Sequence, residues 1–189
     1  MGSEDSGRGA PPAWQTLSSE PLATYHMFSV RRERVRNPRG GVEKTFDIVE
    51  SPQGVSVVAL TDAGELVMVA QYRVPLGRVS LEAPAGALDD GEGVLDAARR
   101  ELREETGFEG GAGELLGTMV LNPSWQGSVC HVVLVRGARP VAQKDPDAGE
   151  DTRVRRVPLA ELDALLASGQ VDSAVTLGSI ALYDRAAGR

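Results

Sequence analysis

One stretch of this chain, residues 86–108, constrains its fold and chemistry more than any other. It reads GALDDGEGVLDAARRELREETGF, and its apolar residues recur at spacings of one, three and four from Val94 onward. That spacing predicts an amphipathic helix from about Glu92 to Thr106 with one apolar face. Gly107 follows directly, and glycine is the usual residue just past the end of a helix.

Three glutamates lie side by side on another face of this predicted helix. Glu101 precedes Glu104 by three residues and Glu105 by four, and side chains at those separations are neighbours. A solvated surface explains some of these acids, but it does not explain three adjacent carboxylates after a glycine-rich approach. Carboxylate oxygens suit a hard divalent cation, Mg²⁺ or Mn²⁺, whose other ligands include water and substrate phosphates. Arg100, four residues before Glu104, is placed to orient that carboxylate.

The segments around this helix are mostly strand-like. The turn NPRGG at 37–41 separates strand-like segments at 24–36 and 42–51, which predicts an N-terminal antiparallel hairpin. Strands mixed with three helices predict an α/β or α+β sandwich. Further strands are expected at 54–61, 65–74, around 81, 115–121, 128–137 and 152–159, and further helices at 159–169 and 173–187.

The composition argues against several functional classes. A net charge of −7 argues against a nucleic-acid binder, because phosphate backbones are held by basic surfaces. No apolar stretch approaches the roughly 20 residues that span a bilayer, so no membrane contact is expected. The single cysteine, Cys130, lies in an apolar run and is interpreted as a packing residue. Residues 1–13 are polar and lack the pattern of a secretory signal, which predicts a disordered leader and a cytoplasmic protein.

The acidic stretch resembles a known motif. Gly86, five residues, Glu92, seven residues and then RELREETGF from Arg100 are similar to the Nudix box at every defining position. This resemblance implies the Nudix α/β/α sandwich, with a mixed central sheet and an N-terminal antiparallel hairpin. It also implies Mg²⁺-dependent hydrolysis of a nucleoside diphosphate linked to another moiety.

Segments outside the box are similar to the ADP-ribose pyrophosphatase branch of this family. They are AQYRVP at 70–75, LEAPAG at 81–86, and Pro123, which stands sixteen residues past Gly107 as a marker proline does in that branch. The branch implies that ADP-ribose or a related nucleotide sugar is cleaved to a nucleoside monophosphate and a sugar phosphate. Trp125 stands where many relatives carry glycine, and this departure weakens the case for ADP-ribose itself as the preferred substrate.

The resemblance also implies which residues hold the metal and carry the catalysis. Two box glutamates match the family's metal-binding positions, a third is a bridging or supporting member, and the residue before the box glycine offers its main-chain carbonyl. In related enzymes an acidic loop supplies a further ligand and, in some, the general base; here that loop is 140–151. The base is left open between Glu150, Asp147, Asp151 and a box glutamate. The predicted metal set is Ala85, Glu101, Glu104, Glu105 and Glu150, and the predicted catalytic set is Arg100, Glu104 and Glu150.

Three side chains of the main domain region are expected at the substrate. Arg73 matches an arginine that contacts substrate in the family, with a strand-end ion pair as the alternative. Glu82 matches a glutamate beside the bound nucleotide, or it only adds negative charge near the metal. Trp125 would stack on a base or ribose, or it would pack within the sandwich.

Arginines are concentrated in the predicted hairpin, at positions 31, 32, 34, 36 and 39. They form an exposed strand face or else a dimer contact that offers guanidinium groups, including that of Arg34, to the neighbour's substrate. Relatives in the branch exchange this hairpin between subunits, so the resemblance implies a homodimer. The chain is accordingly divided into a leader at 1–13, a dimerising hairpin segment at 14–51 and a Nudix hydrolase domain at 52–189.

Two other functions stay open at this point. One is a housecleaning hydrolase of nucleoside triphosphates, which would release inorganic pyrophosphate. The other is a Nudix-fold ligand sensor without catalysis. Such sensors usually lose a box glutamate, and this chain retains all of them.

Overall fold

The computed structural model describes residues 10–141 and 152–189, which form two compact units. The first unit contains the described residues up to Ser51 and a short separate segment, Asn122–Gly127. The second unit contains Pro52–Leu121 and Ser128–Arg189. The helix predicted in the acidic stretch and the mixed sheet described below belong to the second unit.

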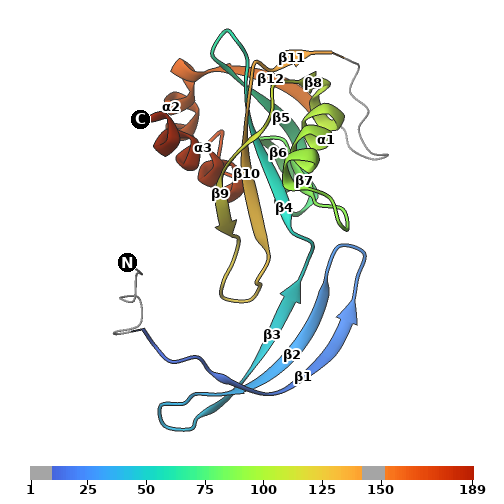
Figure 1. Cartoon of the computed structure of the whole chain (residues 1–189), viewed down its shortest axis with the longest axis vertical. Coiled ribbons are helices and arrows are strands. Elements are labelled where there is room, and N and C mark those ends of the chain that lie inside the picture. The colour runs from blue at the N-terminus through green and yellow to red at the C-terminus, as the bar shows by residue number, and fades with distance from the viewer. Residues whose placement is uncertain (1–9, 142–151) are drawn as a thin grey trace, which may run out of the picture. The chain divides into compact units, whose positions relative to one another are not determined.

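The first unit is a three-stranded antiparallel sheet in the order β1-β2-β3 (Figure 1). Its strands are β1 (Gln15–Thr24), β2 (Ser29–Arg36) and β3 (Glu43–Glu50). The turn predicted at 37–41 joins β2 to β3, where the Gly41 N–H donates to the Asn37 carbonyl at 3.0 Å. Gly40 and Gly41 both have positive φ, a conformation that glycine adopts without strain.

The two-stranded hairpin predicted from the sequence omits one strand, because β1, which pairs with β2, was not predicted. The segment expected as one strand from residue 24 instead turns at its start: the Tyr25 N–H donates to the Phe28 carbonyl at 2.8 Å. That turn ends β1 and lets β2 begin at Ser29. Nearly all of β1 is exposed, and it includes Pro21, so it lacks the apolar alternation that predicts a strand.

The second unit is built on a mixed sheet with the order β12-β5-β4-β10-β9. Strand β10 runs parallel to β4, whereas the other neighbours in this order are antiparallel. Short strand β6 pairs with β5, and β7 pairs with β4. A 3₁₀ turn, η1 (Val74–Leu76), links β5 to β6. The strands are β4 (Gly54–Leu60), β5 (Glu65–Arg73), β6 (Arg78–Glu82), β7 (Ala85–Ala87), β9 (Glu114–Val120), β10 (Val129–Arg136) and β12 (Thr152–Pro158), with a separate pair β8 (Phe108–Glu109) and β11 (Arg139–Pro140).

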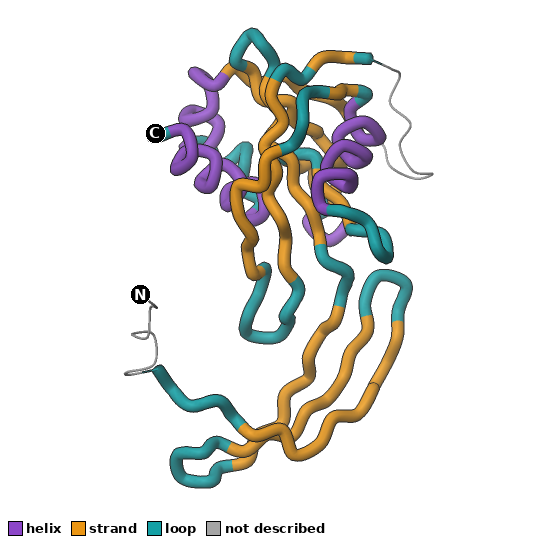
Figure 2. Tube along the Cα trace, viewed as in Figure 1, coloured by secondary structure: helices purple, strands orange, loops and turns teal. Residues whose placement is uncertain are grey.

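Helices cover both faces of this sheet. Helix α1 (Val94–Thr106) lies on one face, and α2 (Leu159–Ala167) and α3 (Ala174–Ala187) lie on the other (Figures 1 and 2). Alternate residues of each strand fill the two cores: Val57 packs on the α1 side, and Val58 packs on the α2 and α3 side. The predicted α/β/α sandwich with a mixed central sheet is confirmed.

Two further expectations from the sequence concern the burial of Cys130 and the absence of a membrane-spanning helix. Cys130 is buried, as expected of a packing residue, and burial raises the pKa of its thiol to about 11. Within residues 10–141 and 152–189, no helix combines the length and apolarity that crossing a membrane requires.

Candidate active site

Helix α1 is positioned by its apolar face and by glycines at its two ends. Ala97, Ala98 and Leu102 are buried against the sheet. The helix begins after Gly93, two residues later than predicted, and it ends where predicted. Gly107 there has a φ of 71°, and its N–H donates to the Arg103 carbonyl at 2.7 Å. The glutamates of α1 therefore have fixed positions relative to β4 and β7.

Glu105 is directed at the main chain of β7. Its side chain is buried, and Oε2 accepts the N–H of Ala85 at 3.0 Å. Ala85 is held in turn by strand pairing, opposite Ser56 of β4. The structure thus brings together the predicted ligand Glu105 and the residue whose carbonyl was predicted as a main-chain ligand.

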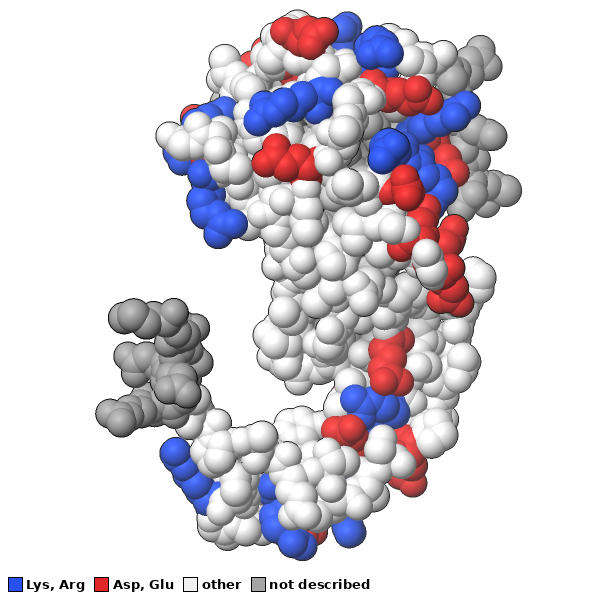
Figure 3. Space-filling model, viewed as in Figure 1, with Lys and Arg blue, Asp and Glu red and all other residues white. Residues whose placement is uncertain are grey.

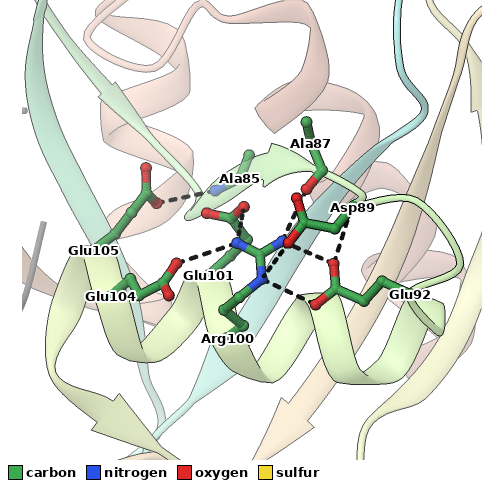
Figure 4. Close-up of polar contacts among 8 residues, drawn as sticks. All are labelled: Ala85, Ala87, Asp89, Glu92, Arg100, Glu101, Glu104 and Glu105. Carbon is green, nitrogen blue, oxygen red and sulfur yellow. Dashed lines mark hydrogen bonds and ion pairs between the residues drawn. The ribbon is translucent and has the colours of Figure 1, made fainter. Parts of the chain in front are cut away.

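Glu101 lies against the next residue of the same strand. A Cβ atom added to Gly86 would lie 2.0 Å from Glu101 Oε1, so this carboxylate could not keep its position beside any other residue. Only glycine lets the carboxylate approach the backbone so closely. The carboxylates of Glu101 and Glu105 therefore meet the same Ala85–Gly86 segment from two successive turns of α1. Figure 4 shows both glutamates and the bond from Glu105 to Ala85.

Arg100 links the remaining acidic groups of the box. Its guanidinium donates to Glu92 through Nε and Nη2, to Glu101 at 2.8 Å and to Glu104 at 3.1 Å (Figure 4). It also donates to the Ala87 carbonyl at 2.9 Å. The hydrogen bonds from Arg100 lower the pKa of Glu92 to about 2, and those same bonds raise the pKa of Arg100. The predicted contact between Arg100 and Glu104 is present, and Arg100 orients Glu101 as well.

A divalent cation fits the chemistry of these oxygens. The two carboxylates of Glu101 and Glu105 and the main chain of Ala85 are hard oxygen donors grouped around one short strand. Across residues 10–141 and 152–189, no three His, Cys, Asp or Glu side chains converge at metal-ligand spacing. Arg100 lies between Glu101 and Glu104 and donates a hydrogen bond to each of them. The guanidinium thus supplies the positive charge beside these carboxylates.

Arg73 and Glu82 form a two-point ion pair across β5 and β6. Nε and Nη2 of Arg73 donate to the two Glu82 oxygens at 3.0 and 2.7 Å. Burial alone would raise the pKa of Glu82, but the hydrogen bonds and charge of Arg73 outweigh it, so the pKa is lowered. Both residues line a pocket of about 410 Å³ together with Arg78, Ser80 and Asp172. The strand-end ion pair weighed for Arg73 is present, and its contact with substrate stays a prediction.

Arg34 and Trp125 both belong to the first unit. Arg32 pairs with Asp47 at 2.7 Å and Arg36 pairs with Glu43 at 2.7 Å, so much of the predicted basic face is neutralised by β3. Figure 3 shows acidic atoms directly beside basic ones along one edge of this sheet. Arg34 is less engaged, because its Nε lies 3.9 Å from the same Glu43. Its role at a substrate stays a prediction.

Trp125 is held by its main chain against β3. The Val49 N–H donates to the Trp125 carbonyl at 2.8 Å, and Val49 also forms a β-bridge with Gln126. The indole side is not enclosed, since Trp125 is 45% exposed. Stacking of Trp125 on a base or ribose stays a prediction.

Glu150, Asp147 and Asp151 lie outside the described residues. The described residues that flank them are both bonded to the end of α1. The Val141 N–H donates to the Gly107 carbonyl at 2.9 Å, and Thr152 Oγ1 donates to the Glu105 carbonyl at 3.3 Å. Thr152 is not among the predicted site residues, and its one distinguishing mark in the sequence is its place between an acidic segment and a predicted strand.

Comparisons with known proteins agree with this geometry. A family model described as the NUDIX domain matches residues 50–176. The chain is 34% identical over 169 residues to the ADP-ribose pyrophosphatase of Mycobacterium tuberculosis, covering 88% of this chain and 81% of the relative. It is 36% identical over 187 residues to the ADP-sugar pyrophosphatase of Mus musculus, covering 87% and 84%. A crystal structure of an ADP compounds hydrolase is similar with a TM-score of 0.83 and 25% identity, covering 95% of this chain and 98% of that one.

Proposed function

This chain belongs to the Nudix family, and we propose that it hydrolyses the diphosphate of a nucleoside diphosphate linked to another moiety, with Mg²⁺ as the cofactor. One observation carries the proposal: Glu101 and Glu105 both reach the Ala85–Gly86 segment, where Gly86 leaves no room for a side chain. Mn²⁺ has the same preference for oxygen ligands and is an alternative cofactor.

Glu101, Glu105 and the Ala85 carbonyl would hold the cation, with Glu104 and Glu150 as the further ligands. When bound, Mg²⁺ would neutralise the diphosphate oxygens and make the attacking water more acidic. Arg100 keeps the carboxylates of Glu101 and Glu104 in place by its hydrogen bonds. Arg73 would contact a phosphate through its guanidinium, whose exposed part faces the pocket it shares with Glu82.

The reaction needs one proton acceptor. A water oxygen forms a bond to one phosphorus, the bridging P–O bond breaks, and the other phosphate leaves with the electron pair. The proton lost by the water goes to a carboxylate. We assign that carboxylate to Glu150 first, and to Asp147, Asp151 or Glu104 as the alternatives.

The preferred substrate is proposed from the named relatives and from the matching segments outside the box. Relatives at 32 to 36% identity carry the names ADP-ribose pyrophosphatase and ADP-sugar pyrophosphatase. We therefore propose ADP-ribose or a related nucleotide sugar, with AMP and ribose 5-phosphate as the products from ADP-ribose. Glu82, Trp125 and Arg34 are proposed as further substrate contacts.

We also propose a cytoplasmic homodimer that pairs through the first unit. The chain mass is 20.0 kDa, so light scattering should give about twice that value. The mass of a single chain at micromolar concentration would contradict the dimer.

A substrate panel tests the function directly. Purified protein is incubated with ADP-ribose, other nucleotide sugars, dinucleotides and nucleoside triphosphates, with and without Mg²⁺, and the products are separated. A nucleoside monophosphate and a sugar phosphate, formed only with the metal, are expected. Release of inorganic pyrophosphate from triphosphates alone would favour the housecleaning hydrolase. Binding without turnover of any compound would favour the ligand sensor.

A further inference from the structure

Glu105 is held at two points by two different strands. Its carboxylate Oε2 accepts the N–H of Ala85 on β7 at 3.0 Å. Its main-chain carbonyl accepts the hydroxyl of Thr152 on β12 at 3.3 Å. Glu105 is 4% exposed and Thr152 is 0% exposed, so water does not replace either partner freely. The first contact fixes where the carboxylate points, and the second fixes the turn of helix that carries it.

The bond between the Glu105 carbonyl and the Thr152 hydroxyl lies at the carboxy-terminal end of α1. Main-chain carbonyls at this end of a helix lack hydrogen-bond donors within the helix. The last carbonyls of a helix have no N–H four residues further along to accept from. The Arg103 carbonyl still accepts the N–H of Gly107, but the chain leaves the helix at Gly107, so the helix has no N–H four residues past Glu105. The Glu105 carbonyl instead accepts the hydroxyl of Thr152, which belongs to β12. Leaving a buried carbonyl without such a donor is costly, so the hydroxyl favours one placement of this last turn.

Thr152 is itself fixed by the sheet. It begins β12 and pairs with Gln71 of β5, so its hydroxyl is presented from the edge strand of the mixed sheet. The contact joins residues 47 positions apart in the sequence. A shift of β12 would therefore move the helix turn that carries Glu104 and Glu105.

We propose that Thr152 is a positioning residue for the metal ligand Glu105. By holding the carbonyl of Glu105, the hydroxyl fixes the last turn of α1 so that the carboxylate meets the Ala85–Gly86 segment. This inference rests on the metal-binding role proposed for Glu105. A displacement of about 1 Å at a reacting group costs on the order of a hundredfold in rate, so a small rotation of this turn is sufficient to matter.

Two substitutions separate the hydroxyl from the shape of the side chain. Thr152→Val keeps the branched shape and removes the donor, whereas Thr152→Ser keeps the donor. Loss of a group that orients a metal ligand typically costs about ten- to a hundredfold in metal affinity or activity. In Thr152→Val we expect Mn²⁺ binding, measured by calorimetry without substrate, to weaken about tenfold. We expect kcat to fall similarly while KM changes less than about twofold, and Thr152→Ser to stay within about twofold of wild type in all three.

A matched control lies on the same strand. Val157 is buried in the other core, against α2 and α3, so Val157→Thr makes the reverse isosteric change away from Glu105. It should lower the melting temperature, because it buries a hydroxyl, but leave Mn²⁺ affinity at the wild-type value. If Thr152→Val behaves like this control, with lower stability and wild-type Mn²⁺ affinity, Thr152 has only a structural role and the proposal is wrong.

Two further variants distinguish the possible failures. Wild-type Mn²⁺ affinity in Glu105→Gln would overturn the metal role of Glu105 and this proposal with it. A loss in Glu105→Gln without a loss in Thr152→Val would overturn the positioning role alone. Should Thr152→Val fail to fold, Thr152→Cys supplies a weaker donor of similar size. It should bind Mn²⁺ less tightly than Thr152→Ser does, and equal binding would overturn the proposal.

Discussion

The guanidinium of Arg100 and the carboxylate of Glu92 are joined at two points, Nε to Oε1 and Nη2 to Oε2, each at 2.9 Å. The same carboxylate accepts the N–H of Asp89 at 3.1 Å, and Arg100 also donates to the Ala87 carbonyl. This pair therefore fastens the segment before α1 to the helix. The segment begins at β7, the strand that contacts Glu101 and Glu105, so the pair helps to hold that strand against the helix.

The Glu92 pair predicts a specific loss of stability in acid. Hydrogen bonds from Arg100 lower the pKa of Glu92 from its ordinary value of 4.5 to about 2. Between these two pH values the unfolded chain takes up a proton at Glu92 that the folded chain does not. The contribution of Glu92 to stability is thus fully present above pH 4.5 and is lost as the pH falls towards about 2. Urea unfolding across this range measures it.

The matching variant for this prediction is Glu92→Gln. The glutamine cannot ionise, so its free energy of unfolding should fall less steeply with acid than that of wild type. Other carboxylates titrate in both proteins, and the difference between the two curves isolates Glu92. Parallel curves would show that the ion pair has no effect on acid stability.

Replacing Glu105 by glutamine should abolish most turnover. The substitution keeps the size of the side chain and an oxygen that can accept the Ala85 N–H, but it removes the ligand charge. We expect kcat to fall by roughly a hundredfold or more at saturating Mg²⁺, with the circular dichroism spectrum unchanged. Glu109→Gln is the control, because Glu109 is paired with Arg103 at 3.6 Å on the exposed side of the helix end. Near-normal turnover in Glu105→Gln would contradict the metal assignment.

A methyl group at Gly86 should disable the site. In Gly86→Ala the new carbon would lie 2.0 Å from Glu101 Oε1, so the carboxylate or the strand must move. We expect kcat to fall at least about tenfold, since small displacements of catalytic groups are costly. Gly127→Ala is the matched control, because its added carbon meets nothing within 4 Å. Equal steady-state activity in the two variants would show that turnover does not depend on the close contact of Gly86 and Glu101.

The proton acceptor is tested by three acidic variants. If Glu150 is the metal ligand or base, Glu150→Gln should lower kcat strongly with little change in KM, because the interaction forms mainly in the transition state. Asp147→Asn and Asp151→Asn should then cost much less. Rates measured between about pH 6 and 10 separate the candidates, because a general base leaves its own pKa in the profile. A severe loss in one of the aspartate variants instead would move the assignment to that residue, and three mild losses would favour Glu104.

Local patterns explain which elements were predictable. Helix α1 was found because its apolar residues repeat at helical spacing and Gly107 ends it with a positive φ. Strands β4 and β10 were found because continuous apolar runs mark strands buried on both faces. Strand β1 was missed because its side chains are mostly exposed and carry no such pattern. Strand β7 was missed because it is only three residues long and is a strand by virtue of its pairing with β4.

Contacts between distant residues account for the rest of the site. The sequence showed that arginines gather in β2, but only the register with β3 places Asp47 opposite Arg32 and Glu43 opposite Arg36. In the same way, the spacing of the box put Glu101 and Glu105 on one helix face but could not show that Gly86 lies against Glu101. A long-range partner such as Thr152 leaves no mark in the local pattern around Glu105.

The pairing of Val49 with residues 125 and 126 limits where this chain can be cut into fragments that keep their strand contacts. The first unit is discontinuous in sequence, since it includes Asn122–Gly127 from between β9 and β10. A cut between Ser51 and Pro52 would give an amino-terminal fragment without that segment and a carboxy-terminal fragment in which it lacks its partner strand. The Val49 N–H and the Trp125 carbonyl would each lose the other. Modular exchange of the amino-terminal sheet between relatives therefore requires transplanting two pieces of chain together.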